Sequence, residues 1–154
     1  MKKLLLLSFV LAFMFKSESQ SDLNNYKYAV VPLQYEFFKG KDVYRLNTLT
    51  RALFKEQGFS TYFTEQELPE DLFKDRCLAL YPNVIKVKGG LFKRKVQIII
   101  KDCTGNIIHE SDIGDSGENN HQKAYHEALR KAFKSVERLK YKYTPKPKLD
   151  KICA

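Results

Sequence analysis

Three runs of apolar and β-branched residues follow one another between residues 77 and 113, and they constrain the fold more than any other feature of the chain. The runs are 77–87 (CLALYPNVIKV), 96–101 (VQIIIK) and 107–113, and only short turns that contain glycine separate them. A parallel strand pair needs a crossover of about a dozen residues or more, so these short turns predict antiparallel pairing. We expect three neighbouring strands here, the first of them kinked at Pro82.

Two stretches with helical periodicity lie on either side of this region. In 43–57 the leucines recur at intervals of three and four residues, and Gly58 follows where a left-handed helix cap belongs. In 121–139 an apolar stripe alternates with lysine and arginine, which is typical of a helix with one buried face. We expect a loop before this second helix, with Asp115 or Ser116 as its cap.

Two further strands are predicted nearer the N-terminus. The run at 27–37 alternates apolar and polar residues and should bend, bulge or end its pairing at Pro32, and 59–63 (FSTYF) is rich in aromatic residues. Between them and the three neighbouring strands at 77–113 lies the polar segment 64–75, with one helical turn expected at Pro69. The order β-α-β-β-β-β-α predicts an α+β fold: a mixed, mostly antiparallel sheet of about five strands with two long helices packed on one face.

The N-terminus has the layout of a secretory signal peptide over residues 1–19. Two lysines precede the apolar run 4–15, and Ser17 and Ser19 provide small residues before a cleavage site. The run is too short to span a bilayer, although an uncleaved anchor is the alternative. We therefore predict an exported, periplasmic or secreted protein with one domain over 20–143 and a flexible basic tail over 144–154, and no transmembrane segment in the mature chain.

The charge of the chain narrows the class of partner. The full chain has a formal net charge of +9, and removal of residues 1–19 lowers it to +7. Such a balance admits acidic partners of any kind, whether nucleic acid, anionic lipid or an acidic protein surface. Export argues against nucleic acid, and no RNA-binding aromatic motif is present. The expected partner is another envelope protein or an acidic surface; the oligomeric state stays open.

The three cysteines matter because an exported chain can form disulfides. Cys77 and Cys103 lie in the body of the domain, and Cys153 is next to the last residue. Either the first two pair or they are separate buried thiols, and the sequence leaves both alternatives open. The third cysteine could pair between chains or stay free.

The sequence predicts no catalytic residue, no cofactor and no metal site. The three histidines have no metal-ligand spacing, and the motifs of serine hydrolases and zinc proteases are absent. Acidic residues cluster in one polar segment, at Glu65, Glu67, Glu70 and Asp71. The cluster is typical of a solvated loop, and a pair of glycosidase carboxylates among these acids is the alternative.

The turn predicted after the strand 77–87 is the most distinctive candidate contact surface. It combines five basic residues with an adjacent apolar pair: Lys86, Lys88, Leu91, Phe92, Lys93, Arg94 and Lys95. Such a hairpin tip can touch an anionic lipid headgroup layer or an acidic protein. The alternative is a soluble turn whose lysines protect a sheet edge from pairing.

Several segments resemble a group of small exported Bacteroidota proteins of unknown function. They include YKYAVVP at 26–32, YRLNTLTRALFKEQGF at 44–59, LPEDLFKDRCLALY at 68–81, KDCTG at 101–105 and AYHEALRKAF at 124–133. The order of elements is also distantly similar to the N-terminal domain of the Tol-system translocation protein and to the lipoprotein activators of penicillin-binding proteins. That resemblance implies a fold and a protein-binding role in the envelope, although this chain lacks a lipobox cysteine and an attached propeller.

These observations together predict a non-enzymatic exported module that binds another envelope component. The alternative from a different class is an unrecognised hydrolase that acts on wall or extracellular polymer. A cleft that holds two close acids, or a serine beside a histidine, would favour the hydrolase.

Overall fold

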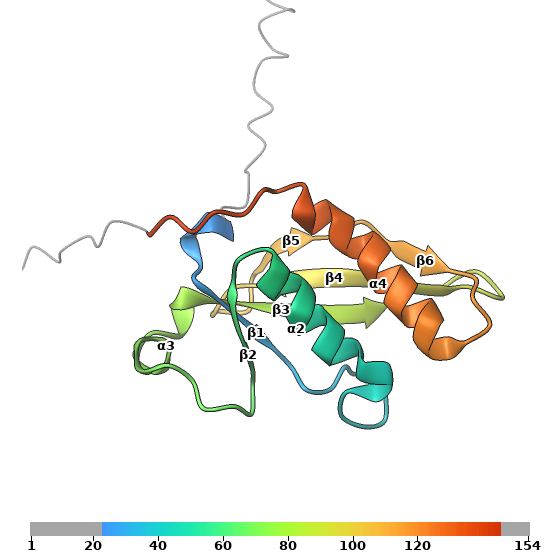
Figure 1. The fold of residues 1–154 in the computed structure, drawn as a ribbon, viewed down its shortest axis with the longest axis horizontal. Coiled ribbons are helices and arrows are strands. Elements are labelled where there is room, and N and C mark those ends of the chain that lie inside the picture. Colours follow the sequence, from blue (N-terminus) through green and yellow to red (C-terminus); the bar gives the residue numbers. More distant parts are fainter. Residues whose placement is uncertain (1–22, 146–154) are drawn as a thin grey trace, which may run out of the picture.

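The computed structural model describes residues 23–145, so the predicted signal peptide at 1–19 and most of the predicted tail at 144–154 lie outside the described residues. The elements in chain order are the 3-10 helix η1 (Leu23–Asn25), β1 (Tyr28–Val31), η2 (Val43–Arg45), α2 (Leu46–Glu56), β2 (Ser60–Phe63), α3 (Glu70–Lys74), η3 (Arg76–Leu78), β3 (Ala79–Lys86), β4 (Arg94–Lys101), β5 (Ile107–Glu110), β6 (Gly114–Ser116) and α4 (His121–Glu137). Figure 1 shows their arrangement.

The strands form one mixed sheet. Its order is β2-β1-β3-β4-β5, and β6 also pairs with β4. The pairs β1–β2 and β1–β3 are parallel, whereas β4 pairs antiparallel with β3, β5 and β6. The predicted α+β class, with a mixed and mostly antiparallel sheet, is therefore confirmed.

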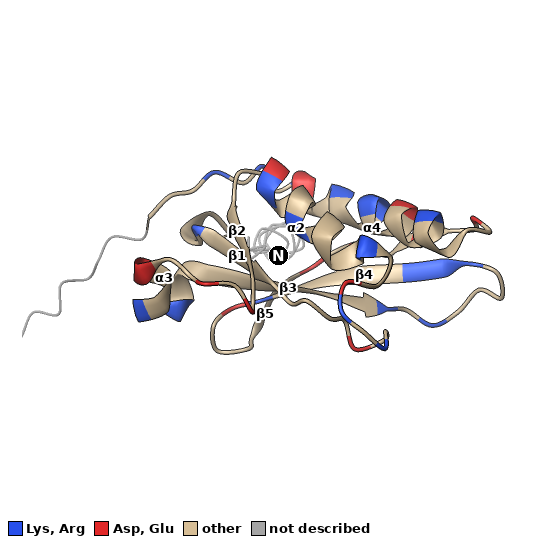
Figure 2. Ribbon diagram, turned by 60° about the horizontal axis from the view of Figure 1, so that its bottom comes forward, with Lys and Arg blue, Asp and Glu red and all other residues tan. Residues whose placement is uncertain are grey.

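Helices α2 and α4 cover the same face of this sheet (Figures 1 and 2). Their buried residues form one apolar core with the strands beneath them, in which Phe54 of α2 and Phe133 of α4 meet edge to face at 5.1 Å between ring centroids. The short helix α3 places Leu72 against Tyr28 and Val30 on the opposite face. Strand β1 is buried along its whole length because it lies between these two cores. No helix within 23–145 is long and apolar enough to cross a membrane.

The end of α2 follows the sequence prediction. Gly58 has a φ of 104°, the left-handed conformation in which glycine costs little. Its N–H donates to Lys55 O at 3.0 Å, and the Phe59 N–H donates to Phe54 O at 3.2 Å. The two rings, Phe54 and Phe59, then pack at 5.7 Å. This is a Schellman cap with its apolar contact, and it turns the chain directly into β2.

The two strand predictions that involve proline differ in outcome. The predicted strand 27–37 is shorter than expected, since β1 ends at Val31 directly before Pro32. By contrast, β3 runs unbroken through Pro82. In an antiparallel ladder, every second residue of a strand directs its N–H toward the partner strand. Val87 is one of these residues, since its N–H donates to Lys95 O. Pro82 lies an odd number of residues before Val87, so its nitrogen faces away from β4. Because β1 pairs with β3 only as far as Leu80, Pro82 removes no ladder hydrogen bond there.

The region between β4 and α4 corrects three predictions. The expected strand 107–113 ends at Glu110, and the expected loop after it contains β6. Neither Asp115 nor Ser116 caps α4, because Asn120 does so by accepting from Lys123 N at 2.9 Å. Strand β6 was missed because it holds three residues without an apolar pattern; its pairing with the start of β4 defines it.

The chain after α4 is docked on the N-terminal part of the domain as far as Thr144. The Tyr141 ring stacks on Phe59 at 3.5 Å between centroids. The Thr144 N–H donates to Asn24 O at 2.7 Å, and the Lys142 N–H donates to the Asn24 side chain. The segment after α4 therefore lies along η1, and the docked part extends at least one residue into the tail predicted to begin at 144.

Candidate functional site

The most exposed large apolar side chains among the described residues lie at the tip of the β3–β4 hairpin. Leu91 is 92% exposed and Phe92 is 81% exposed. Figure 1 shows this hairpin loop at one end of the molecule, the end at which α4 begins. Adjacent apolar side chains at a projecting loop add nothing to the core and face solvent at an energetic cost.

The backbone of the loop explains why these two side chains project. Val87 N–H donates to Lys95 O at 2.9 Å and closes the ladder. Gly89 and Gly90 follow with φ values of 108° and 86°, a conformation that side chains rarely adopt. The glycine pair turns the chain, so the next two residues, Leu91 and Phe92, lie at the outer end of the loop.

Two of the five basic residues anchor the hairpin where its loop joins β4, a position that we call the hairpin base. Lys93 Nζ pairs with Asp115 Oδ2 of β6 at 2.7 Å and lowers the pKa of that carboxyl. Arg94 donates to Nδ1 of His121, the first residue of α4, at 3.0 Å. These contacts connect the hairpin to β6 and α4. Lys93 and Arg94 are therefore already engaged within the protein.

The other three basic residues, Lys86, Lys88 and Lys95, form no ion pair within residues 23–145. The Lys95 ammonium lies beside the glycine turn, at 3.8 Å from where a Cβ on Gly89 would stand. Figure 2 shows the basic residues along the loop and the first part of β4. The tip thus joins an apolar pair to three cations that form no ion pair in this part of the chain, of which Lys95 lies opposite Asp115 of β6.

A strained segment supports the same end of the molecule. Asp42, Tyr44 and Arg45 have φ values of 45°, 56° and 57°, which are costly for residues other than glycine. The Tyr44 carbonyl accepts from His126 Nε2 at 2.7 Å, and its ring stacks over His121 at 6.2 Å. Helix α4 therefore holds the strained segment and the hairpin base through adjacent contacts.

Three acidic residues of the polar segment form ion pairs with separate lysines. Glu65 pairs with Lys41 at 2.6 Å, and Asp71 pairs with Lys27 at 3.0 Å. Glu70 pairs with a lysine one helical turn away. The ammonium of Lys27 is also the main cause of a lowered pKa at Asp71. These carboxylates are therefore engaged in ion pairs with different partners.

Two open hollows lie away from the hairpin. One, of about 540 Å³, is lined by Thr64, Gln66, Glu67, Leu68, Glu70, Phe73 and Arg76. The other, of about 500 Å³, lies between α2 and β2 and contains two cations, Arg51 and Lys55, and no acid. Neither hollow contains a histidine, and within 23–145 no three His, Cys, Asp or Glu residues are grouped as metal ligands.

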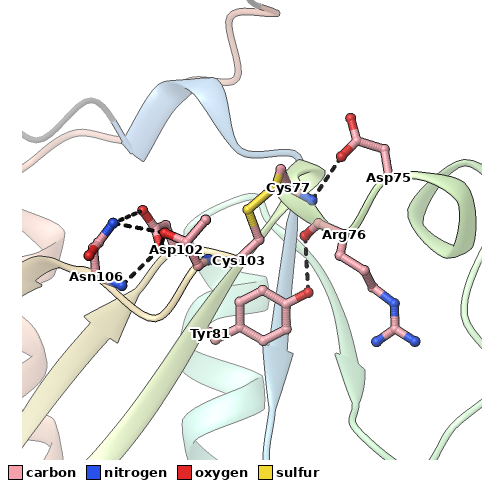
Figure 3. Close-up of a disulfide and its surroundings, with 8 residues drawn as sticks. Asp75, Arg76, Cys77, Tyr81, Asp102, Cys103 and Asn106 are labelled. Atoms are coloured by element: carbon pink, nitrogen blue, oxygen red, sulfur yellow. Dashed lines mark hydrogen bonds between the residues drawn. A yellow bond between two sulfur atoms is a disulfide. The ribbon is translucent and has the colours of Figure 1, made fainter.

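Cys77 and Cys103 form a disulfide, with an S–S distance of 1.94 Å (Figure 3). The bond joins η3, directly before β3, to the turn directly after β4. That turn is ordered by Asp102, whose carboxylate accepts from the N–H groups of Thr104 and Asn106. Hydrogen bonds, above all from Thr104, lower the pKa of Asp102. The bond thus lies at the end of the hairpin opposite its tip, while Cys153 lies outside the described residues.

The structure therefore divides the predicted contact residues into two groups. Leu91, Phe92 and three lysines are free to meet a partner, whereas Lys93 and Arg94 hold the hairpin in place. Sequence reasoning missed the anchors Asp115 and His121, because their contacts come from elements that only the folded sheet brings together.

The comparisons with known proteins leave the family open. No family model matches the chain, and no curated protein matches it. Among solved structures, two PelC dodecamers from Paraburkholderia phytofirmans, one of them a point variant, are similar at 12% identity. The match covers 77% of this chain and 91% or 90% of theirs, with TM-scores of 0.49 and 0.47. At these scores the likeness supports no inference about activity, partner or assembly.

Proposed function

We propose that this protein is an exported, non-enzymatic binding module that contacts another component of the cell envelope through the tip of its β3–β4 hairpin. The observation that carries the proposal is the exposure of Leu91 and Phe92, 92% and 81%, at the outer end of a loop. Full burial of each of these side chains by a partner would stabilise the complex by on the order of 2 kcal/mol.

The construction of the hairpin base supports a binding role. Arg94 and Lys93 hold the loop against α4 and β6 through contacts of 3.0 and 2.7 Å. A loop held in this way loses little conformational entropy when it binds, and such preorganisation strengthens association. A loop that only protected a sheet edge would need its lysines but not an exposed apolar pair.

The ion pairs of two acids weigh against one form of the hydrolase alternative, a catalytic pair made of Glu65 and Asp71. Paired catalytic carboxylates must flank one bond of the substrate. Here Glu65 and Asp71 are each engaged by a different lysine, at 2.6 and 3.0 Å. Glu67 and Glu70 line one open hollow, so they are the pair through which the hydrolase alternative would act, and Glu70 is engaged by Lys74.

Site-specific photo-crosslinking tests the proposal. Phe92 is replaced by a photoreactive phenylalanine analogue in the full chain, and the protein is irradiated in the cells that produce it. The matched control carries the same analogue at Phe73, which is 70% exposed and lies on α3. We expect an adduct with an envelope component from position 92 and none from position 73. Absence of an adduct at 92, or equal adducts at both positions, would refute the proposal.

A further inference from the structure

We infer that the partner of the hairpin tip is an anionic lipid surface, with Leu91 and Phe92 at the boundary of the acyl chains and Lys86, Lys88 and Lys95 among the headgroups. The inference rests on the proposed function and names the partner of the same site. It commits to lipid for three reasons: the shape of the tip, the order of its residues and its charge.

The first reason is that the apolar pair projects from the surface and lies in neither of the two hollows described above. Both side chains stand at the outer end of a loop, and neither lines the hollows found in the structure. A protein partner would need a pocket fitted to two adjacent side chains. A lipid interface accepts projecting apolar side chains without such complementarity, as interfacial anchors do.

The second reason is the order of residues along the hairpin. Lys86 lies opposite Val96 at the end of the ladder, and Lys95 lies one residue nearer the loop. The Lys95 ammonium is directly beside the glycine turn. The apolar pair comes beyond these cations. A membrane surface has the same order, in which charged headgroups precede the acyl chains.

The third reason is that the cations at the tip are not fully neutralised by the protein itself. Asp115 is the acid that reaches the hairpin base; Lys93 pairs with it at 2.7 Å, and Lys95 lies opposite it in the β4–β6 register. Lys86 and Lys88 therefore remain available, and Lys95 shares a single carboxylate with Lys93. Each cation near an anionic leaflet strengthens binding about fivefold, and salt weakens this attraction.

Vesicle sedimentation tests the inference. The purified protein is mixed with vesicles of phosphatidylcholine alone, or of phosphatidylcholine and phosphatidylglycerol in equal parts. We expect sedimentation with the anionic vesicles, much less with the neutral ones, and a decrease as the salt concentration rises. Failure of the unaltered protein to sediment with anionic vesicles at low salt would overturn the inference.

Paired variants separate the tip from the rest of the surface. Leu91→Ser with Phe92→Ser should weaken vesicle binding at least about tenfold. The matched control, Phe73→Ser with Ile107→Ser, removes two exposed apolar side chains elsewhere and should bind normally. All four sites are exposed, so each variant should keep the thermal unfolding curve of the unaltered protein. Equal vesicle binding by the two variants would refute a role for the tip.

A second pair of variants tests the cations. One variant changes three lysines at the tip: Lys86→Ser, Lys88→Ser and Lys95→Ser. Its control changes three exposed lysines elsewhere, so that both variants have the same net charge: Lys55→Ser, Lys134→Ser and Lys142→Ser. We expect the first set to weaken anionic-vesicle binding about a hundredfold and the control set to have a much smaller effect. Equal losses would show that net charge alone attracts the protein.

The crosslinking experiment distinguishes failure of this inference from failure of the proposed function. A photoadduct of position 92 with lipid supports both. An adduct with a protein, in cells in which position 73 gives none, retains the proposed function and overturns the lipid inference. No adduct at position 92 overturns both.

Discussion

Gly114 lies where β6 packs directly against the backbone of α4, and its replacement by alanine provides a stringent test of the fold. A Cβ at this position would stand 1.8 Å from the carbonyl oxygen of Ala128 and 2.5 Å from the nitrogen of Ala132. Both atoms belong to the backbone of α4, so a side-chain rotation cannot relieve the overlap. The helix or the strand has to move.

The size of the effect follows from the required displacement. Relief of the clash moves α4 away from the sheet by about 1 Å or more, and a gap of that size forfeits a quarter to a half of each dispersion contact across it. The contacts at risk are those of a fully buried stripe that includes Leu129 and Phe133. Overpacking of a core costs about 1–3 kcal/mol and occasionally more, and the rigidity of the clashing atoms places Gly114→Ala at about 3 kcal/mol.

Urea denaturation followed by circular dichroism measures this loss. For a slope of about 1.5 kcal/mol per molar urea, a loss of about 3 kcal/mol lowers the midpoint by about 2 M. Gly117→Ala is the matched control, because a Cβ there has no atom within 4 Å. A midpoint for Gly114→Ala within about 0.5 M of both the control and the unaltered protein would refute the close packing of α4 on β6.

Three further changes are expected to have distinct signatures. Removal of the disulfide with Cys77→Ser and Cys103→Ser should cost about 3.5 kcal/mol in the chain-entropy treatment, read as the difference in urea midpoint from the oxidised protein. Asp71→Asn should reduce the loss of unfolding free energy at acid pH. The Lys27 ammonium is the main cause of a lowered pKa of Asp71 in the folded state. The stabilisation by the Asp71 carboxylate is therefore complete above the ordinary pKa of 3.8 and is lost as the pH falls through the folded-state pKa. Tyr141→Phe should cost about 1 kcal/mol by removing the 2.6 Å hydrogen bond from its hydroxyl to a backbone carbonyl. Burial raises the pKa of Tyr141 to about 12. As the pH rises from about 10 through 12, the melting temperature of the unaltered protein should therefore fall by the share that the protonated Tyr141 contributes, and Tyr141→Phe should show no such share.

The elements that could be predicted from sequence are those whose information is local. The Schellman cap of α2 is an example, because Gly58 and the following Phe59 provide the left-handed residue and the apolar contact within the same turn. The strand β4 is another, since four of the six residues of VQIIIK at 96–101 are buried in it. The exposed hairpin tip could also be foreseen, because glycines and lysines flank its apolar pair.

The elements that were missed depend on contacts between distant parts of the chain. Strand β6 exists because residues 114–116 pair with the start of β4, and nothing in the triplet Gly-Asp-Ser indicates a strand. The left-handed conformation of Tyr44 is unusual for an aromatic residue, and its carbonyl is held by His126, which is 82 residues away. The anchors of the hairpin base, Lys93 to Asp115 and Arg94 to His121, are likewise fixed by the sheet and not by local pattern.

The disulfide has a mechanical consequence for the hairpin. Cys77 precedes β3 and Cys103 follows β4, so the bond closes both strands and their loop into a single covalent ring. A protease that cuts the loop once after Lys93 would therefore leave the molecule in one piece until a reductant opens the bond. A pull on the tip, such as a bound surface exerts, reaches the disulfide-bonded ends of both strands together, and neither strand can be separated from the ring while the bond is intact.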